Sequence, residues 1–406
     1  MTSKTPGHMQ IITGNYAAAL AAMLSRVQVV AAYPITPQSP ATEALARFVE
    51  SGALNAEYVR VESEHSALAV CIAASTVGAR TFTASSANGL AYMHEQIHWA
   101  AGARLPIVLA CVNRAVGAPW SVLNDQHDSV SQRDTGWIQL YARDSQEILD
   151  TIIQAYRIAE AVYAPTMVCY DGYILSHTVM PVEVPCQKDV DRFLPSYKPH
   201  TSLDPAAPCN LNLVTLSNPR EDAQGVLCHA YMELRYLLHE ALENSLDTIV
   251  QVDREFGDIF GRSYGGTHWG YCLEDAEVVL MAMGSLASEA TVAADRLREE
   301  GHRAGVLGLR VYRPFPRRQL VEALQHARLV VVFDKNVSYG YEGATCSDLK
   351  AALYTQGVRL PVHNYIVGLG GRDVKARELV DAAQRSARWV EEGRLEKPAE
   401  WLNCHI

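Results

Sequence analysis

Two kinds of segment alternate along most of this chain: short apolar runs and longer helix-like stretches. The alternation starts with the Ala/Leu-rich stretch "NYAAALAAMLS" (15–25), followed by "VQVVAAYP" (27–34), a β-branched run that ends at a proline. Near-continuous apolar strands separated by helical stretches predict a parallel sheet covered by helices on both faces. The sequence therefore predicts an α/β fold, in which ligands bind at the carboxyl ends of the strands.

The same pattern predicts the other elements. Between residues 15 and 175 we expect strands at 56–63, 80–86, 106–112 and 165–172, and helices at 41–51, 64–78, 89–102 and 146–162. A second series has strands at 276–283, 303–311 and 328–334, and helices at 286–300, 317–327 and 342–355. Between the two series, the Pro-rich polar stretch 177–220 is interpreted as a surface connection, and 221–257 as a long bridging helix.

A chain of 406 residues is too long for a typical single core. We predict a first α/β domain at 1–200, a helical linker at 201–269, a second α/β domain at 270–370 and a helical tail at 371–406.

Composition excludes several classes of function. The formal net charge of −10 and the lack of a Lys/Arg-rich run argue against a nucleic-acid partner. The N-terminus resembles no secretory signal, and no apolar run reaches membrane-spanning length, so we expect a cytoplasmic protein without a membrane partner. No two of the nine cysteines lie within three residues of each other, so the close spacings that hold iron–sulfur clusters are absent.

One short motif suggests a zinc hydrolase. His94, Glu95 and His98 match the pattern in which two histidines on one helix face bind Zn²⁺ and a glutamate activates its water. A catalytic zinc needs a third protein ligand, and the longer motif would require a histidine where Arg104 stands. A zinc metallohydrolase is therefore kept only as an alternative function, and no metal ligand is predicted.

Three polar residues follow predicted strands. The proline-rich corner "YPITPQSP" holds Thr36 at a strand end, where it is either part of a rigid turn or a substrate contact. Glu64 opens an apolar helix, either as a cap or as a buried acid directed at a cofactor. Arg114 opens the long polar loop 113–137, which is either a surface salt-bridge loop or a functional one in which the arginine holds a carboxylate.

Longer motifs carry a resemblance to a known family. "AAYPITPQSP", "VESEHSAL", "RTFTASSANGLAYMHE", "AAGARLPIVLACVNRA", "SQRDTGW", "GSLASEA", "VYRPFP", "FDKN" and "IVGLGGRDV" occur in order over nearly the whole chain. Together they resemble the α subunit of the 2-oxoacid:ferredoxin oxidoreductases, which include pyruvate:ferredoxin oxidoreductase. The resemblance makes "GLAYMHE" part of the family pattern, so His98 completes the zinc triplet by coincidence.

The resemblance implies a thiamine-diphosphate enzyme. Residues 1–200 would form its pyrimidine-binding domain, and 270–370 a domain similar to the transketolase C-terminal domain. Glu64 stands where the family binds N1′ of the aminopyrimidine, and Pro34, Ile35 and Asn88 would also contact the cofactor. Thr36 would bind the keto oxygen of a 2-oxo acid, and Arg114 its carboxylate.

The sequence also departs from other thiamine enzymes. It contains no Gly-Asp-Gly segment, which anchors the diphosphate through Mg²⁺ elsewhere. We therefore expect half an active site, with the diphosphate and Mg²⁺ on a β subunit and [4Fe-4S] clusters on γ- and δ-type subunits, in a dimer of hetero-oligomers.

The reaction expected is oxidative decarboxylation with coenzyme A. Pyruvate and a larger acid such as phenylglyoxylate both remain open as substrates, since Trp120 either shapes the acyl site or is a packing residue. Electrons would pass to ferredoxin or, through a flavin subunit, to NAD⁺. A non-catalytic scaffold subunit is a further alternative, disfavoured because Thr36, Glu64 and Arg114 occur together.

Overall fold

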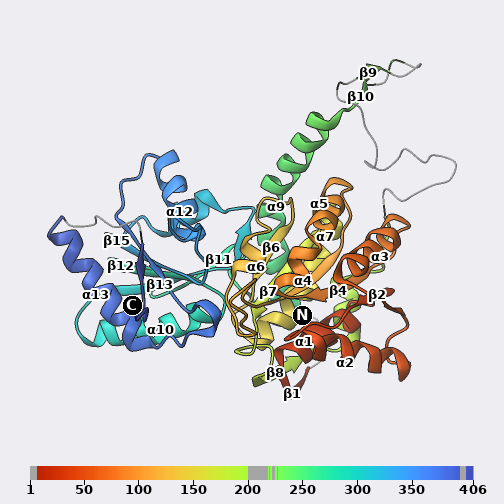
Figure 1. Ribbon diagram of the computed structural model, residues 1–406, viewed down its shortest axis with the longest axis horizontal. Helices are drawn as coiled ribbons and strands as arrows, with labels where there is room; N and C mark the ends of the chain where they lie inside the picture. Colours follow the sequence, from red (N-terminus) through yellow and green to blue (C-terminus); the bar gives the residue numbers. More distant parts are fainter. Residues whose placement is uncertain are drawn as a thin grey trace.

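The computed structural model describes residues 7–199, 218, 220–221, 225, 227–393 and 399–405. These residues form two large sheets flanked by helices, with the long helix α9 (Tyr231–Phe260) between them (Figure 1). The predicted α/β fold with parallel sheets is confirmed.

The first sheet has seven strands in the order β14-β6-β7-β5-β4-β2-β3. Its strands are β2 (Val29–Ala32), β3 (Glu57–Arg60), β4 (Thr81–Ser85), β5 (Val108–Asn113), β6 (Ile138–Tyr141), β7 (Thr166–Asp171) and β14 (Val311–Arg313). All neighbouring strands are parallel except β14 and β6, which are antiparallel. Because the carboxyl ends of parallel strands meet at one edge, the segments that follow β5, β4, β2 and β3 lie side by side.

Helices cover both faces of the first sheet, as predicted. One face carries α1 (Gly14–Leu24), α2 (Ser39–Glu50) and α7 (Ser145–Val162), and the other carries α3 (Glu64–Thr76), α4 (Ala87–Tyr92), α5 (His94–Gly102) and the short α6 (His127–Val130). Helices α7 and α3 begin at side-chain caps. The Asp144 carboxylate accepts the Glu147 amide at 2.8 Å, and the Ser63 hydroxyl accepts the Ser66 amide at 3.2 Å, which fixes the first turns of α7 and α3.

The second sheet has six strands in the order β11-β13-β12-β15-β16-β17. They are β11 (His268–Tyr271), β12 (Val278–Met283), β13 (Ala304–Leu309), β15 (Leu329–Asp334), β16 (Val362–Ile366) and β17 (Glu400–Trp401). Only β11 runs antiparallel to its neighbour in this sheet. The flanking helices are α10 (Ser285–Glu299) and α13 (Ala376–Glu391) on one face, α11 (Arg317–Ala323) and α12 (Ala344–Thr355) on the other, with the 3₁₀ turn η1 (Leu369–Gly371) after β16.

The stretch 177–220, expected to be an irregular connection, contains regular elements in its described part. Its strand β8 (Val179–Val184) pairs antiparallel with β1 (His8–Thr13), which was not predicted, and α8 (Gln187–Phe193) follows. The prediction of an irregular excursion was wrong because Val182 and Val184 are buried and the N-terminal strand supplies their backbone partners. The small pair β9 (Arg220–Glu221) and β10 (Leu227–Cys228) precedes α9.

The predicted strand 303–311 is divided between the two sheets. β13 ends at Leu309 in the second sheet, and β14 pairs with β6 at the edge of the first. Between them lies Arg310, a fully buried residue whose guanidinium contacts Glu147 at 3.2 Å and the Gly266 carbonyl at 2.9 Å. The crossing therefore joins the two sheets through a buried ion pair.

The remaining predicted elements are found, but strands β6, β11, β16 and β17 were not predicted, and the bridging helix expected at 221–257 is α9, which begins only at Tyr231. The predicted helix 89–102 is interrupted at Met93, which divides it into the end of α4 and α5. Parts of the predicted linker 201–269 and of the tail 371–406 lie outside the described residues. Among the described helices, none is both long and apolar enough to cross a lipid bilayer.

Candidate functional site

The corner that follows β2, residues 33–40, is hydrogen-bonded on its inner side to buried side chains. The Asn15 amide donates to the Pro37 carbonyl at 2.8 Å, and the Tyr170 hydroxyl donates to Asn15 Oδ1 at 3.0 Å. Thr36 and Pro34 are exposed, and Ile35 is half-buried. The corner is therefore rigid on its inner side and presents Thr36 outward.

Arg114 follows the end of β5 and reaches this corner. Its Nη1 donates to the Thr36 carbonyl at 2.8 Å, and its Nε to the Ser121 carbonyl at 3.3 Å. The structure thus brings together two of the residues predicted to bind the substrate, although Arg114 contacts the Thr36 backbone rather than its hydroxyl.

Glu64 lies in the first turn of α3, after β3. The residue is only 8% exposed, and its carboxylate packs directly over the backbone of Gly89 in α4. A Cβ at position 89 would lie 2.5 Å from Glu64 Oε1. Within the described part of the chain, no hydrogen bond or ion pair of this carboxylate is found. Without a partner among the described residues, this carboxyl is free to form a hydrogen bond with a ligand.

Asn88 precedes Gly89 in α4 and is half-buried. Its Oδ1 accepts the Gly117 amide at 3.2 Å, so it contacts the loop that begins at Arg114. The residues predicted for cofactor and substrate therefore belong to adjacent segments at the carboxyl edge of the first sheet.

Asp128 connects these segments, and the sequence indicated no role for it. Its Oδ2 accepts the Ala87 and Arg114 amides, each at 2.9 Å, and its Oδ1 accepts the Asn113 side chain at 2.7 Å and the Ser129 amide at 2.8 Å. Burial raises the pKa of Asp128 to about 6, against the lowering effect of these hydrogen bonds. A mixed polar loop in the sequence was the only signal that pointed to its region.

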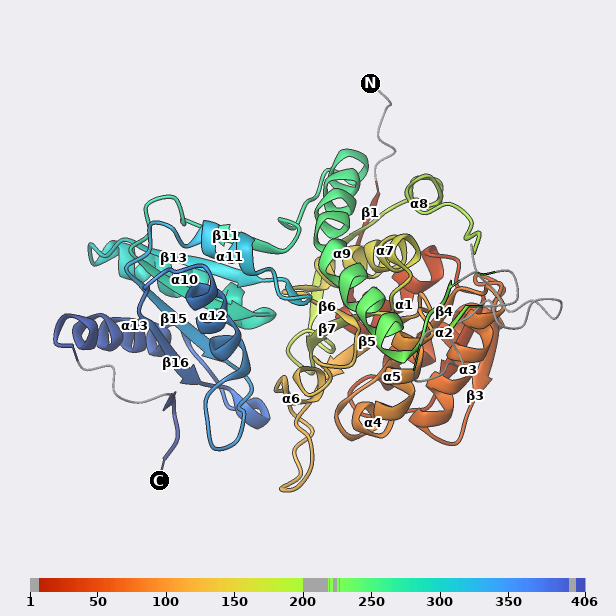
Figure 2. The ribbon, with the colours of Figure 1, turned by 90° about the horizontal axis from the view of Figure 1, so that it is seen from above.

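The loop 113–137 is held at the strand ends of both sheets, by Asp171 at the end of β7 and by Lys335 after β15. The Gln126 amide donates to the Lys335 carbonyl at 2.8 Å, and the Asn124 side chain donates to Asp171 Oδ1 at 2.7 Å. Lys335 Nζ lies 3.0 Å from the same Asp171 oxygen. The segment ahead of α6 extends away from both sheets (Figure 2), and Trp120 within the loop is 71% exposed, so it is not a packing residue of this chain.

The zinc motif gains no support. His94 and His98 do share a face of α5, with ring centroids 4.8 Å apart, but His94 Nδ1 is hydrogen-bonded to Gln132 Oε1 at 2.6 Å. Among the described residues, no group of three or more His, Cys, Asp or Glu side chains could hold a metal ion.

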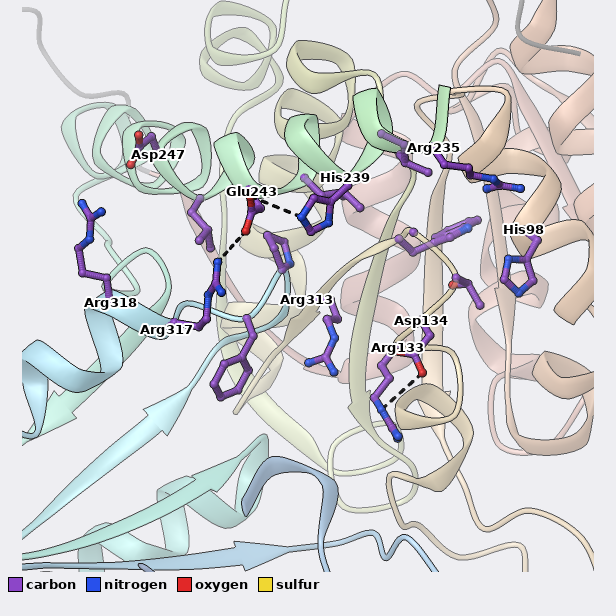
Figure 3. Close-up of a pocket in the computed structure, with 18 of the residues that line it drawn as sticks. His98, Arg133, Asp134, Arg235, His239, Glu243, Asp247, Arg313, Arg317 and Arg318 are labelled. Carbon is purple, nitrogen blue, oxygen red and sulfur yellow. Dashed lines mark hydrogen bonds and ion pairs between the residues drawn. The ribbon is translucent and has the colours of Figure 1, made fainter. Parts of the chain in front are cut away.

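A cavity of about 860 Å³ lies elsewhere, between α9 and the β14–α11 connection (Figure 3). Its charged lining is mostly paired, since Arg317 binds Glu243 at 2.6 Å and Arg313 binds Asp348 at 2.9 Å. It contains none of the strand-end residues above.

Comparison with known families covers most of the chain. A family model described as "Pyruvate flavodoxin/ferredoxin oxidoreductase, thiamine diP-bdg" matches residues 20–252, and "Pyruvate:ferredoxin oxidoreductase core domain II" matches residues 276–379.

Similar curated proteins match along their full length. The ketoisovalerate oxidoreductase subunit VorA of Pyrococcus horikoshii is 47% identical over 97% of this chain and 98% of its own. The pyruvate synthase subunit PorA of Methanothermobacter thermautotrophicus is 45% identical over 94% of this chain and 98% of its own.

Two solved structures share the fold. The 2-oxoglutarate:ferredoxin oxidoreductase from Magnetococcus marinus superposes with a TM-score of 0.68 at 19% identity, covering 93% of this chain and 65% of that one. A split-gene transketolase superposes with a TM-score of 0.53 at 15% identity, covering 93% of this chain and 99% of that one.

Proposed function

The chain belongs to the pyruvate flavodoxin/ferredoxin oxidoreductase family, and on that premise we propose that it is the α-type subunit of a multi-subunit 2-oxo acid oxidoreductase. The family resemblance seen in the motifs is confirmed, and with it 2-oxo acid oxidoreductase function. In the proposed reaction, a 2-oxo acid and coenzyme A give an acyl-CoA, CO₂, a proton and two electrons. The electrons pass to [4Fe-4S] clusters of partner subunits and then to ferredoxin or NAD⁺.

The observation that carries the proposal is the unpaired Glu64 carboxylate, buried over Gly89 at the carboxyl edge of the first sheet. Thiamine diphosphate supplies a carbon nucleophile once its aminopyrimidine is driven to the imino tautomer. Glu64 would hold and exchange the proton at N1′ of that ring, which gives the carboxyl the partner it lacks among the described residues.

The neighbouring residues would bind the rest of the ligands. Thr36 is exposed at the rigid corner, where its hydroxyl would bind the substrate keto oxygen. Arg114 Nη1 lies 2.8 Å from the Thr36 carbonyl oxygen, and the remaining N–H groups of this guanidinium suit a carboxylate. Pro34, Ile35 and Asn88 would line the cofactor, with Asn88 placed next to the glycine that Glu64 covers.

Partner subunits would complete the site. The chain has no Gly-Asp-Gly segment, so the diphosphate and Mg²⁺ would be held by a β subunit. γ- and δ-type subunits would carry the clusters, in a cytoplasmic dimer of hetero-oligomers. The close relatives are themselves named as subunits, which supports this arrangement.

We also propose the division into a pyrimidine-binding domain at 1–200, a linker at 201–269, a transketolase C-terminal-like domain at 270–370 and a tail at 371–406. The two family matches, to 20–252 and 276–379, support a boundary near residue 270.

The test is turnover of the purified multi-subunit complex against pyruvate, 2-oxoisovalerate, 2-oxoglutarate and phenylglyoxylate, with coenzyme A and a reducible dye. We expect one or more of these acids to be oxidised by the complex and none by this chain alone. Activity of the isolated chain would contradict the shared site, and an inactive, correctly assembled complex with bound cofactor would contradict the function.

A further inference from the structure

We propose, on the premise of the proposed function, that Asp128 is a positioning residue that couples the cofactor end of the site to the substrate end. It acts by fixing two backbone segments with one carboxylate.

The geometry at Asp128 Oδ2 carries the proposal. This single oxygen accepts the amides of Ala87 and Arg114, each at 2.9 Å, although these residues follow different strands, β4 and β5. The Asp128 side chain is almost completely buried, with an exposed fraction of 1%. A shift of either segment would therefore leave a buried donor without its acceptor.

Each tethered segment leads directly to a proposed site residue. Ala87 has a φ of 45°, in the left-handed region that non-glycine residues avoid, so its conformation depends on external contacts. It begins α4, in which Gly89 supports the Glu64 carboxylate. Arg114 carries the guanidinium proposed to bind the substrate.

Only an ionised carboxylate satisfies this environment. Four N–H donors converge on the two oxygens, two on each. An asparagine has one acceptor oxygen and one NH₂ group, so in either orientation it directs donors against donors. Asp128→Asn therefore weakens the tether with almost no change of volume, because an NH₂ group in the place of Oδ2 loses both tethered amides, and an NH₂ group in the place of Oδ1 faces the Ser129 amide.

The test is a double-mutant cycle in the assembled complex. Its substrate is whichever of pyruvate, 2-oxoisovalerate, 2-oxoglutarate and phenylglyoxylate the natural complex oxidises fastest. The variants are Asp128→Asn, Arg114→Gln and the double variant, with Asp134→Asn as the matched control. Asp134 lies on the same loop, but its side chain is 81% exposed. The readouts are KM for the 2-oxo acid, kcat and cofactor affinity.

We expect Asp128→Asn to raise KM for the 2-oxo acid by about tenfold and to weaken cofactor binding, while Asp134→Asn changes neither. In the Arg114→Gln background, the additional KM effect of Asp128→Asn should shrink to about twofold or less, because the tethered group is already lost. Full additivity of the two KM effects would overturn the coupling. A normal KM in Arg114→Gln alone would instead contradict the substrate role of Arg114 and hence the proposed function.

If Asp128→Asn does not assemble, Asn113→Ala provides the same test. The Asn113 amide holds the other carboxylate oxygen at 2.7 Å and does not contact Ala87 or the Arg114 amide. We expect Asn113→Ala to raise KM for the 2-oxo acid less than Asp128→Asn does. This increase should again shrink in the Arg114→Gln background. An unchanged KM in this variant would overturn the proposal.

Discussion

Glu64 and Glu62 are two nearby carboxylates that differ in burial and in contacts. Both lie in the same sequence motif, but Glu62 is exposed and accepts the Ser66 hydroxyl. Glu64 is buried with no partner in the described part of the chain. The two carboxylates therefore form a natural pair for comparison.

We expect Glu64→Gln to lower turnover of the assembled complex by about a thousandfold or more, because an amide cannot hold and release the N1′ proton. Glu62→Gln should retain turnover within about twofold, since it perturbs only a solvent-exposed contact. Both variants should assemble, as judged by size-exclusion chromatography. Glu64→Gln with turnover close to that of the natural complex would remove Glu64 from the mechanism.

Gly89 is the residue against which the Glu64 carboxylate packs, so a substitution there should move that carboxylate. A methyl group at this position would lie 2.5 Å from Glu64 Oε1, and a flexible carboxylate can move away without unfolding the chain. We expect Gly89→Ala to lower kcat by about 10–100-fold through misplacement of the Glu64 carboxylate.

The matched control is Gly102→Ala in α5, where the nearest atom to a Cβ is Arg235 Nη1 at 3.6 Å, an ordinary contact. Its kcat should be unchanged. Equal kcat values for the two alanine variants would mean that the position of the Glu64 carboxylate does not depend on Gly89.

At the level of elements, the packing of α13 on β16 contains a titratable group. His363 of β16 is 3% exposed, and its Nδ1 is hydrogen-bonded to Ser386 Oγ of α13 at 2.6 Å. Burial lowers the pKa of His363 to about 4. Because the unfolded chain takes up this proton at about pH 6.5, the contribution of neutral His363 to stability is present above that pH and is lost as pH falls toward 4.

We therefore expect the stability advantage of the natural chain over a His363→Gln variant to shrink as pH is lowered from 6.5 to 4, measured by thermal unfolding at several pH values. The comparison with the variant is needed because burial raises the pKa values of Asp128 and Asp334 to about 6, which gives the opposite pH dependence. A stability difference that is independent of pH would contradict a buried neutral His363.

In the molecule as a whole, the two sheets contact each other next to the candidate site through an apolar cluster and a buried ion pair. One apolar cluster includes Leu109 of the first sheet and Met281 of the second, and Asp171 and Lys335 form a buried ion pair across the junction. Asp171 also accepts the Ser285 amide at 3.0 Å. The second sheet thereby supports the loop that carries Arg114.

Replacing Lys335 should show how much the ion pair with Asp171 contributes to the free energy of unfolding. We expect Lys335→Met to lower the free energy of unfolding by about 3 kcal/mol, because it leaves the buried Asp171 carboxylate without its cation. Lys375→Met, which removes an exposed lysine 3.5 Å from Asp373, should lower it by about 0.5 kcal/mol or less. Denaturant unfolding measures both values, and similar losses in the two variants would show that the junction does not depend on the ion pair.

Local sequence patterns predicted most of the regular elements. Apolar runs and helix-like stretches specified β2, β3, β4, β5 and β7 of the first sheet and β12, β13 and β15 of the second to within a few residues, because side-chain periodicity and turn residues act over short distances. The short strands β6, β11, β16 and β17 were not predicted. Residues that directly follow strands, such as Thr36 and Arg114, could be proposed for the same reason. The family motifs added specific roles to them.

Tertiary structure decided what depends on contacts between distant segments. β8 had no visible periodicity and forms because β1, more than 160 residues earlier in the chain, pairs with it. β14 follows β13 almost directly but pairs with β6 of the first sheet, and Arg310 between them contacts the distant Glu147 at 3.2 Å. The link between Ala87 and Arg114 through Asp128 was equally invisible, since hydrogen bonds between segments far apart in sequence leave no periodic trace in it.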